Sequence, residues 1–143
     1  MEIVVVDGQG GGIGKALVEQ IKRKLPEAKV VAAGANALAT AAMLKAGADA
    51  GATGENAVIY NCKHAKIIAG PLGIVLANAM RGEITPKIAR AAAESEAVKF
   101  LVPVLKCQVH VAGIQEQPVG RLVEAAVSDI CKYAFAEENK WRE

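Results

Sequence analysis

The sequence predicts an α/β protein in which a mostly parallel sheet of about five strands lies between two layers of helices. Short apolar runs of strand length alternate with segments of helical periodicity over the first two thirds of the chain. A run of glycines directly follows the first apolar run, where it joins a strand to a helix. This alternation favours right-handed crossovers between parallel strands.

Length and composition indicate a single domain over residues 1–143, long enough to bury roughly two thirds of its unfolded surface. The hydrophobic fraction of 52% and the charged fraction of 22% exclude a disordered chain. A net charge of +2 is too small to indicate nucleic acid as the partner. The longest uncharged apolar run, residues 67–80, is broken by glycine and proline and is shorter than the ~20 residues that span a bilayer, so no membrane partner is expected.

The cysteines and the first residues bear on the cellular compartment. Cys62, Cys107 and Cys131 are far apart in the sequence and form no pair with metal-ligand spacing. The first residues run directly into a strand, without the basic region, apolar stretch and cleavage site of a secretory signal. We therefore expect reduced thiols in a cytoplasmic protein.

The first part of the chain divides into two pairs of strand and helix. Residues 2–6 form the first predicted strand, and the helix after the glycines ends at Pro26. Residues 29–33 form the second strand, and Asn36 caps a helix that ends at Gly47. The apolar stripe of the first helix recurs every four residues, at Ile13, Leu17, Ile21 and Leu25.

The middle of the chain is predicted to hold a polar loop, a short helix and a third strand. Residues 48–56 form the loop, in which Thr53 caps the short helix, and residues 66–69 form the strand. For residues 74–80 both helix and strand stay open. Thr85 and Pro86 mark the next helix start, a capping hydroxyl followed by proline at the first helical position.

Two more strands and one long helix are predicted in the last third. Residues 98–104 and 108–114 are the fourth and fifth strands. The residues between them are too few for the crossover that parallel neighbours require, so the sequence predicts a hairpin and an antiparallel edge strand. Pro118 then opens the longest helix.

Three glycine-bearing loops, at residues 8–14, 34–36 and 70–73, follow strands and are predicted to gather at one edge of the sheet. Ligands of open α/β sheets bind beyond the carboxyl ends of the strands, which is that edge. The candidate ligand-binding residues are Asp7, Gly8, Gln9, Gly10, Gly11, Gly12, Ile13, Gly14, Asn36, Thr53, Asn56, Gly70, Pro71 and Gly73.

The loop from Gly8 to Gly14 carries the strongest functional signal. Glycine lets the backbone approach a ligand closely, and the first N–H groups of the following helix are unpaired at the positive end of its dipole. The sequence therefore predicts that the loop binds the phosphate of a small ligand. Asp7 either binds a ligand hydroxyl or caps loop amides, and for Thr53 to Asn56 a helix cap is favoured over a ligand contact.

The loop also resembles the first turn of short-chain dehydrogenases, since Gly8, Gly12 and Gly14 have that family's spacing. The family's Tyr-x-x-x-Lys pair is absent, because His64 stands four residues after Tyr60. A Walker phosphate loop is excluded because Lys15 is followed by alanine and not by serine or threonine.

The identity of the ligand stays open among phosphate-bearing compounds. The dinucleotide frame G-x-G-x-x-G has Ile13 at its third glycine, and the acid that binds the ribose of NAD is replaced by Asn36 after the second strand. NADP, a mononucleotide or another phosphate-bearing metabolite is compatible with the loop, and NAD is kept as a candidate despite the missing acid. No catalytic or metal-binding residue is assigned, because neither His64 nor His110 has the setting of a general base.

The chain as a whole resembles an uncharacterised family of short single-domain bacterial proteins, a domain of unknown function with an amino-terminal Asp-Gly-Gln-Gly-Gly-Gly-Ile-Gly. The resemblance extends to residues 43–48, 51–56, 70–71 and 82–86. It implies a Rossmann-like fold and brings no known activity, cofactor or catalytic residue.

Two functions from different classes follow. The first is a nucleotide- or phosphate-binding protein that uses the glycine loop. The second is a non-catalytic structural or regulatory oligomer subunit whose glycine turns serve packing alone. The alanine-rich segment 37–46 and the apolar segment 74–80 have few charges to solvate an outer face, so a homo-oligomer, most simply a dimer, is expected.

Overall fold

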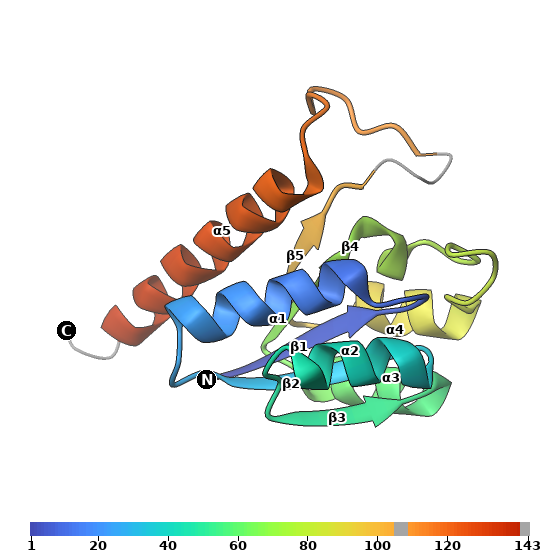
Figure 1. Cartoon of the computed structure of the whole chain (residues 1–143), viewed down its shortest axis with the longest axis horizontal. Coiled ribbons are helices and arrows are strands. Elements are labelled where there is room, and N and C mark those ends of the chain that lie inside the picture. The colour runs from blue at the N-terminus through green and yellow to red at the C-terminus, as the bar shows by residue number, and fades with distance from the viewer. Residues whose placement is uncertain (105–108, 141–143) are drawn as a thin grey trace.

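The computed structural model describes residues 1–104 and 109–140, in which strands and helices alternate (Figure 1). No helix in these two stretches is long and apolar enough to cross a membrane. The elements are β1 (Glu2–Asp7), α1 (Gly12–Lys24), β2 (Lys29–Gly34), α2 (Ala37–Lys45), β3 (Ala50–Thr53), α3 (Glu55–His64), β4 (Ile67–Pro71), the 3-10 helix η1 (Leu72–Val75), α4 (Pro86–Glu94), β5 (Val98–Val102) and α5 (Val119–Asn139).

The strands form a parallel sheet in the order β3-β2-β1-β4-β5. The chain moves outward from β1 to β2 and β3, and then returns to place β4 on the other side of β1. The direction of winding therefore reverses between β1 and β4. In open parallel sheets this reversal leaves a crevice at the carboxyl ends of the two strands, where ligands bind.

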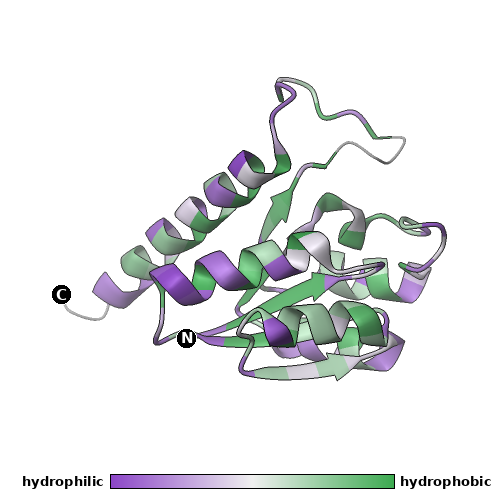
Figure 2. Cartoon of the chain, viewed as in Figure 1, coloured by the Kyte–Doolittle hydropathy of each residue, from purple (hydrophilic) through white to green (hydrophobic). Residues whose placement is uncertain are grey.

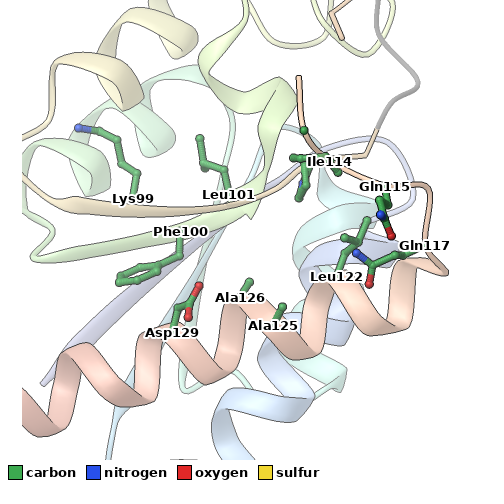
Figure 3. A pocket seen from close by; sticks show the side chains of 12 residues that line it. Lys99, Phe100, Leu101, Ile114, Gln115, Gln117, Leu122, Ala125, Ala126 and Asp129 are labelled. Carbon is green, nitrogen blue, oxygen red and sulfur yellow. The ribbon is translucent and has the colours of Figure 1, made fainter. Parts of the chain in front are cut away.

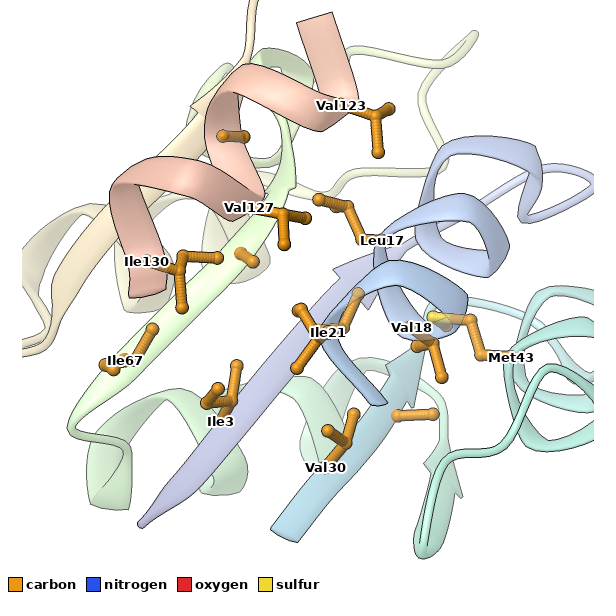
Figure 4. Close-up of a cluster of buried hydrophobic side chains, with 14 of the residues drawn as sticks. Ile3, Leu17, Val18, Ile21, Val30, Met43, Ile67, Val123, Val127 and Ile130 are labelled. Carbon is orange, nitrogen blue, oxygen red and sulfur yellow. The ribbon is translucent and has the colours of Figure 1, made fainter. Parts of the chain in front are cut away.

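Helices cover both faces of the sheet, and the alternation of side chains along β1 divides the core between them. Ile3 and Val5 pack on one face with residues of α1, α2 and α5, including Leu17 and Val127 (Figure 4). Val4 and Val6 pack on the other face with residues of α3 and α4. Hydrophobic residues fill β1, while hydrophilic residues gather at the carboxyl end of α1 (Figure 2). The predicted arrangement of a parallel sheet between helices is confirmed.

The predicted antiparallel edge strand is wrong. The edge strand β5 runs parallel to β4, and residues 109–114 form no strand; Gln108 lies outside the described residues. Ile114 donates its N–H to the carbonyl of Val111 across a turn in which Gly113 has a φ of 83°. The hairpin expected from the short connection therefore does not form, and Val109 instead lines a cleft while the chain leads on to α5.

The loop predicted for residues 48–56 contains a strand. Ala50–Thr53 forms β3 at the edge of the sheet, where it pairs with β2. Its residues have weak strand propensity, so the backbone of β2 and not the local sequence determines this strand. Helix α3 accordingly begins after Gly54, so Thr53 is not its N-cap. The undecided residues 74–80 form the end of η1 and a series of turns.

The predicted starts of α2, α4 and α5 are confirmed, in contrast to the predicted Thr53 cap of α3. Asn36 Oδ1 accepts the N–H of Ala39 at 2.9 Å at the start of α2. Thr85 Oγ1 accepts the N–H of Ile88 at 3.2 Å, and Pro86 is the first residue of α4. Pro118 directly precedes α5.

Candidate functional site

Asp7 is a buried carboxyl group at the carboxyl end of β1, and it holds the two ends of the glycine loop together. Its Oδ1 accepts the N–H of Gly8 and its Oδ2 accepts the N–H of Gly14, each at 2.7 Å. Burial raises the pKa of Asp7, while the bonds from Gly14 and Gly8 oppose that shift and the charge of Glu83 adds to it. Asp7 therefore caps loop amides, one of the two roles that the sequence left open.

Three glycines of the loop are buried, and Gly11 and Gly14 among them are crowded by atoms that cannot readily move. Gly11 has a φ of 71°, and an added Cβ would lie 2.9 Å from the backbone of Ala39 in α2. A Cβ on Gly14 would lie 2.6 Å from the sulfur of Met43, and one on Gly8 would lie 2.7 Å from Oε1 of Glu83. These glycines let α1, α2 and the loop approach each other closely.

Gly10 and Gly12 differ from those three glycines. Both are exposed, neither has a positive φ, and an added Cβ would meet nothing within 4 Å. Packing therefore does not require glycine at either position.

The backbone amides at the start of α1 face this open space. No residue in the described stretches accepts the N–H of Gly12 or Ile13, as is usual for the first turn of a helix. The dipole of α1 adds partial positive charge at the same end. The loop thus presents unpaired donors without side chains that would keep a ligand away.

These residues line a cleft with a volume of about 990 Å³ at the reversal between β1 and β4. Asp7 and Gly8 to Ile13 line it, together with Pro71 at the end of β4 and Gly73 in η1. The remaining wall comes from residues 76–81 and from Val104, Val109 and Val119. Nine of the fourteen predicted ligand-binding residues therefore lie together: Asp7, Gly8, Gln9, Gly10, Gly11, Gly12, Ile13, Pro71 and Gly73.

The other five predicted residues do not line this cleft. Gly14 and Gly70 are buried by packing, and a Cβ on Gly70 would overlap the carbonyl oxygen of Val6. Thr53 Oγ1 donates to Thr40 Oγ1 at 2.8 Å, and Asn56 lies exposed in the first turn of α3. Asn36 lies beside the loop, where its Nδ2 donates to the carbonyl of Gln9 at 2.9 Å.

Glu83 is the polar neighbour of the loop that sequence reasoning missed. Its Oε1 accepts the N–H of Gln9 at 2.9 Å and a bond from Nδ2 of Asn36. The one signal for Glu83 in the sequence is the string at residues 82–86, which belongs to the family resemblance. Residues 76–81 and the three valines of the cleft carried no functional motif.

The sequence comparison identifies the family. Residues 2–134 match the family described as Domain of unknown function (DUF3842). The chain belongs to this family. No curated protein matches its sequence.

A solved structure similar to this DUF3842 protein is that of a dodecameric FMN-dependent Ubix-like decarboxylase from Escherichia coli O157:H7. The two chains are 15% identical, with a TM-score of 0.47 over 90% of this chain and 75% of that one.

A second cavity of about 560 Å³ lies between β5, α5 and residues 113–117 of the DUF3842 protein (Figure 3). Phe100 and Leu101 of β5 and Leu122 of α5 line it, together with Lys99 and Asp129. Lys99 Nζ donates to the carbonyl of Ser95 at 2.6 Å, so this ammonium group is already engaged.

From the sequence, we expect the described stretches of the DUF3842 protein to hold no metal ligands and Cys62 to be a buried core residue. They contain no group of three or more His, Cys, Asp or Glu residues that could hold a metal ion. Burial raises the pKa of the Cys62 thiol to about 11, so this cysteine is a neutral core residue at pH 7.

Proposed function

We propose that this DUF3842 protein binds an anionic ligand, most simply the phosphate group of a mononucleotide, on the backbone of residues 8–13. The observation that carries the proposal is the open space at Gly10 and Gly12, where neither backbone conformation nor packing requires glycine. Glycine is costly where it is not required, since alanine at a position with a compatible backbone adds about 0.4–1 kcal/mol of stability by restricting the unfolded chain. A ligand that must reach the backbone accounts for both residues.

The charge distribution of the loop supports an anion. The N–H groups of Gly12 and Ile13 are unpaired at the positive end of α1, and such helix starts bind phosphate in many nucleotide-binding proteins. The N–H of Gln9 already bonds an anionic oxygen, that of Glu83. The loop also lies at the β1–β4 reversal, where ligands of parallel sheets bind.

We favour a mononucleotide over NAD and NADP. Residue 36 follows β2 at the position that holds a ribose-binding acid in NAD proteins, and here it is an asparagine. Both polar atoms of the Asn36 side chain are engaged, by the Ala39 amide on one side and by Gln9 and Glu83 on the other.

The alternative is an oligomer subunit whose glycine turns serve packing alone. The crowding at Gly11 and Gly14 favours a packing role for these two residues, but it does not account for Gly10 and Gly12. The two functions therefore differ in the effect they predict for substitution of Gly10 or Gly12: a ligand-binding protein should lose affinity, and an oligomer subunit should not change.

Gly10→Ala and Gly12→Ala should leave stability unchanged or slightly raised and weaken ligand binding by about tenfold or more, because each new Cβ enters the space above the loop. The measurement is thermal unfolding with AMP, FMN and inorganic phosphate. A ligand at 100 times its Kd adds about 2.7 kcal/mol, or about 5–10 °C in Tm for a chain of this size. The variants should lose this increase.

Gly120→Ala is the matched control, because a Cβ there also meets nothing within 4 Å and Gly120 lies in α5. It should bind like the wild type. If the wild type shows no increase in Tm with any of these ligands at millimolar concentration, the binding proposal is abandoned and packing remains as the role of the loop.

We also propose a homo-oligomer, most simply a dimer. Three large apolar or aromatic side chains are well exposed on α2, α3 and α5: Leu38 at 69%, Tyr60 at 62% and Phe135 at 68%. Burial of such side chains between subunits is favourable. Light scattering at micromolar concentration should give about twice the 14.8 kDa of one chain, and a mass of one chain would contradict the proposal.

A further inference from the structure

Residues 76–84, here called the 76–84 loop, cross from the end of η1 to the start of α4 as a compact unit. Ile74 before the loop and Ile84 at its end are fully buried. Within the loop, Asn78 N–H donates to the carbonyl of Ile84 at 2.7 Å, and Ile84 N–H donates to that of Ala79 at 3.1 Å. A loop with fixed ends and internal hydrogen bonds can move as one body about its ends.

The backbone of the 76–84 loop is strained. Asn78, Met80 and Arg81 have φ values of 66°, 58° and 58°, in the left-handed region that non-glycine residues rarely adopt. Residues held in such conformations persist when surrounding contacts stabilise them. The contacts of the loop with its surroundings must therefore offset this strain.

Glu83 supplies hydrogen bonds from this loop to the glycine loop. One carboxylate oxygen, Oε1, accepts both the N–H of Gln9 and the Nδ2 group of Asn36. Gln9 is adjacent to Gly10, so this negative oxygen lies beside the backbone that we propose for the ligand. Asp7 contacts the same loop, where its two oxygens accept the N–H groups of Gly8 and Gly14.

The carboxylate of Glu83 has no cation beside it in the described stretches, where the ion pairs involve other acidic residues. It is partly exposed, so it can move into water without breaking a buried ion pair. An arriving phosphate would meet a like charge at the loop, and it would compete with Glu83 for the N–H of Gln9, which lies within the backbone of residues 8–13.

We infer that Glu83 is an intramolecular competitor of the anionic ligand: its carboxylate occupies the glycine loop and holds the 76–84 loop closed until the ligand displaces it. This inference rests on the proposed function. The apparent Kd then equals the intrinsic Kd divided by the fraction of molecules in which Glu83 has left the loop.

Glu83→Gln removes the charge, and Glu83→Ala removes the contact. If about one molecule in ten is open in the wild type, both variants should bind AMP about tenfold more tightly. Isothermal titration with AMP and with inorganic phosphate measures the change. Glu96→Gln is the matched control, because Glu96 is exposed and has the same formal charge. It precedes β5, so it lies at the amino ends of the strands, whereas the glycine loop lies at the carboxyl end of β1.

A second measurement follows the 76–84 loop without any ligand. Arg81 is exposed within the loop, so trypsin cleavage after Arg81 reports how readily the loop opens. The Glu83→Ala variant should be cleaved there about tenfold faster than the wild type, while Glu96→Gln should match the wild type.

The outcomes separate this inference from the proposed function. If neither the wild type nor the Glu83 variants bind AMP or phosphate, the proposed function fails and the competition fails with it. If the wild type binds AMP and the Glu83 variants bind it no more tightly, or more weakly, the inference alone is overturned and a weaker affinity makes Glu83 a ligand contact. Unchanged cleavage after Arg81 in Glu83→Ala overturns the closing role of Glu83.

Discussion

Gly70→Ala is expected to lower the free energy of unfolding by about 3 kcal/mol, or about 6–12 °C in Tm. Gly70 lies in the internal strand β4, and a Cβ there would overlap the carbonyl oxygen of Val6 in the adjacent strand β1. A backbone oxygen inside a paired sheet cannot turn away as a side chain can. The strands must separate, which weakens the pairing that brings the glycine loop and the β4 turn together.

Chemical denaturation followed by circular dichroism measures this loss. Gly120→Ala again serves as the control, because it adds the same methyl group in open space within a helix and should not destabilise the chain. A Gly70→Ala variant as stable as the wild type would show that the sheet accommodates the methyl group, and would remove packing as the reason for this glycine.

Asp7→Ala is expected to lower the free energy of unfolding by about 3 kcal/mol, because it leaves two backbone donors without their acceptor. Asp7 is only 4% exposed, and its two oxygens accept the N–H groups of Gly8 and Gly14. Asp129→Ala is the control, since Asp129 is exposed on α5. Urea denaturation of the three proteins measures the difference, and equal midpoints for both variants would contradict the assigned role.

The stabilisation from Asp7 should also depend on pH with a definite sign. Burial raises the pKa of Asp7 in the folded protein, so the folded state binds the proton more tightly than the unfolded state. The contribution is therefore complete below the unfolded pKa of about 3.9 and falls as pH rises through the higher folded pKa. The difference in unfolding free energy between wild type and Asp7→Ala should decrease from pH 4 to pH 8, and an increase would mean that the pKa is lowered.

Local rules predicted much of the fold. The apolar runs of β1, β2 and β4, the stripe of α1 and the starts of α2, α4 and α5 depend on residues close together in the chain. The two wrong strand predictions concern segments whose pairing depends on a partner, and the wrong Thr53 cap follows from the missed strand β3. Ala50–Thr53 is a strand because β2 pairs with it, and residues 109–114 are not a strand despite their alternation.

The candidate site divides in the same way. The glycine loop was visible because strand, glycines and helix follow one another directly in the sequence. Glu83 could not be predicted as part of the site, because it is 74 residues from Gln9, whose amide it contacts. The turns that bring it there have no periodic pattern in the sequence. The three valines of the cleft could not be predicted as site residues, because apolar residues are as typical of a buried core as of a cleft wall.

The sequence by itself determined that a glycine-rich loop joins the first strand to the first helix, because strand and helix periodicities are local properties. Only the tertiary structure decided which glycines are required by packing. Gly11, Gly14 and Gly70 are crowded by Ala39, Met43 and Val6, whereas Gly10 and Gly12 face open space. Crowding depends on atoms that other elements bring into contact, and no pattern along the chain records it.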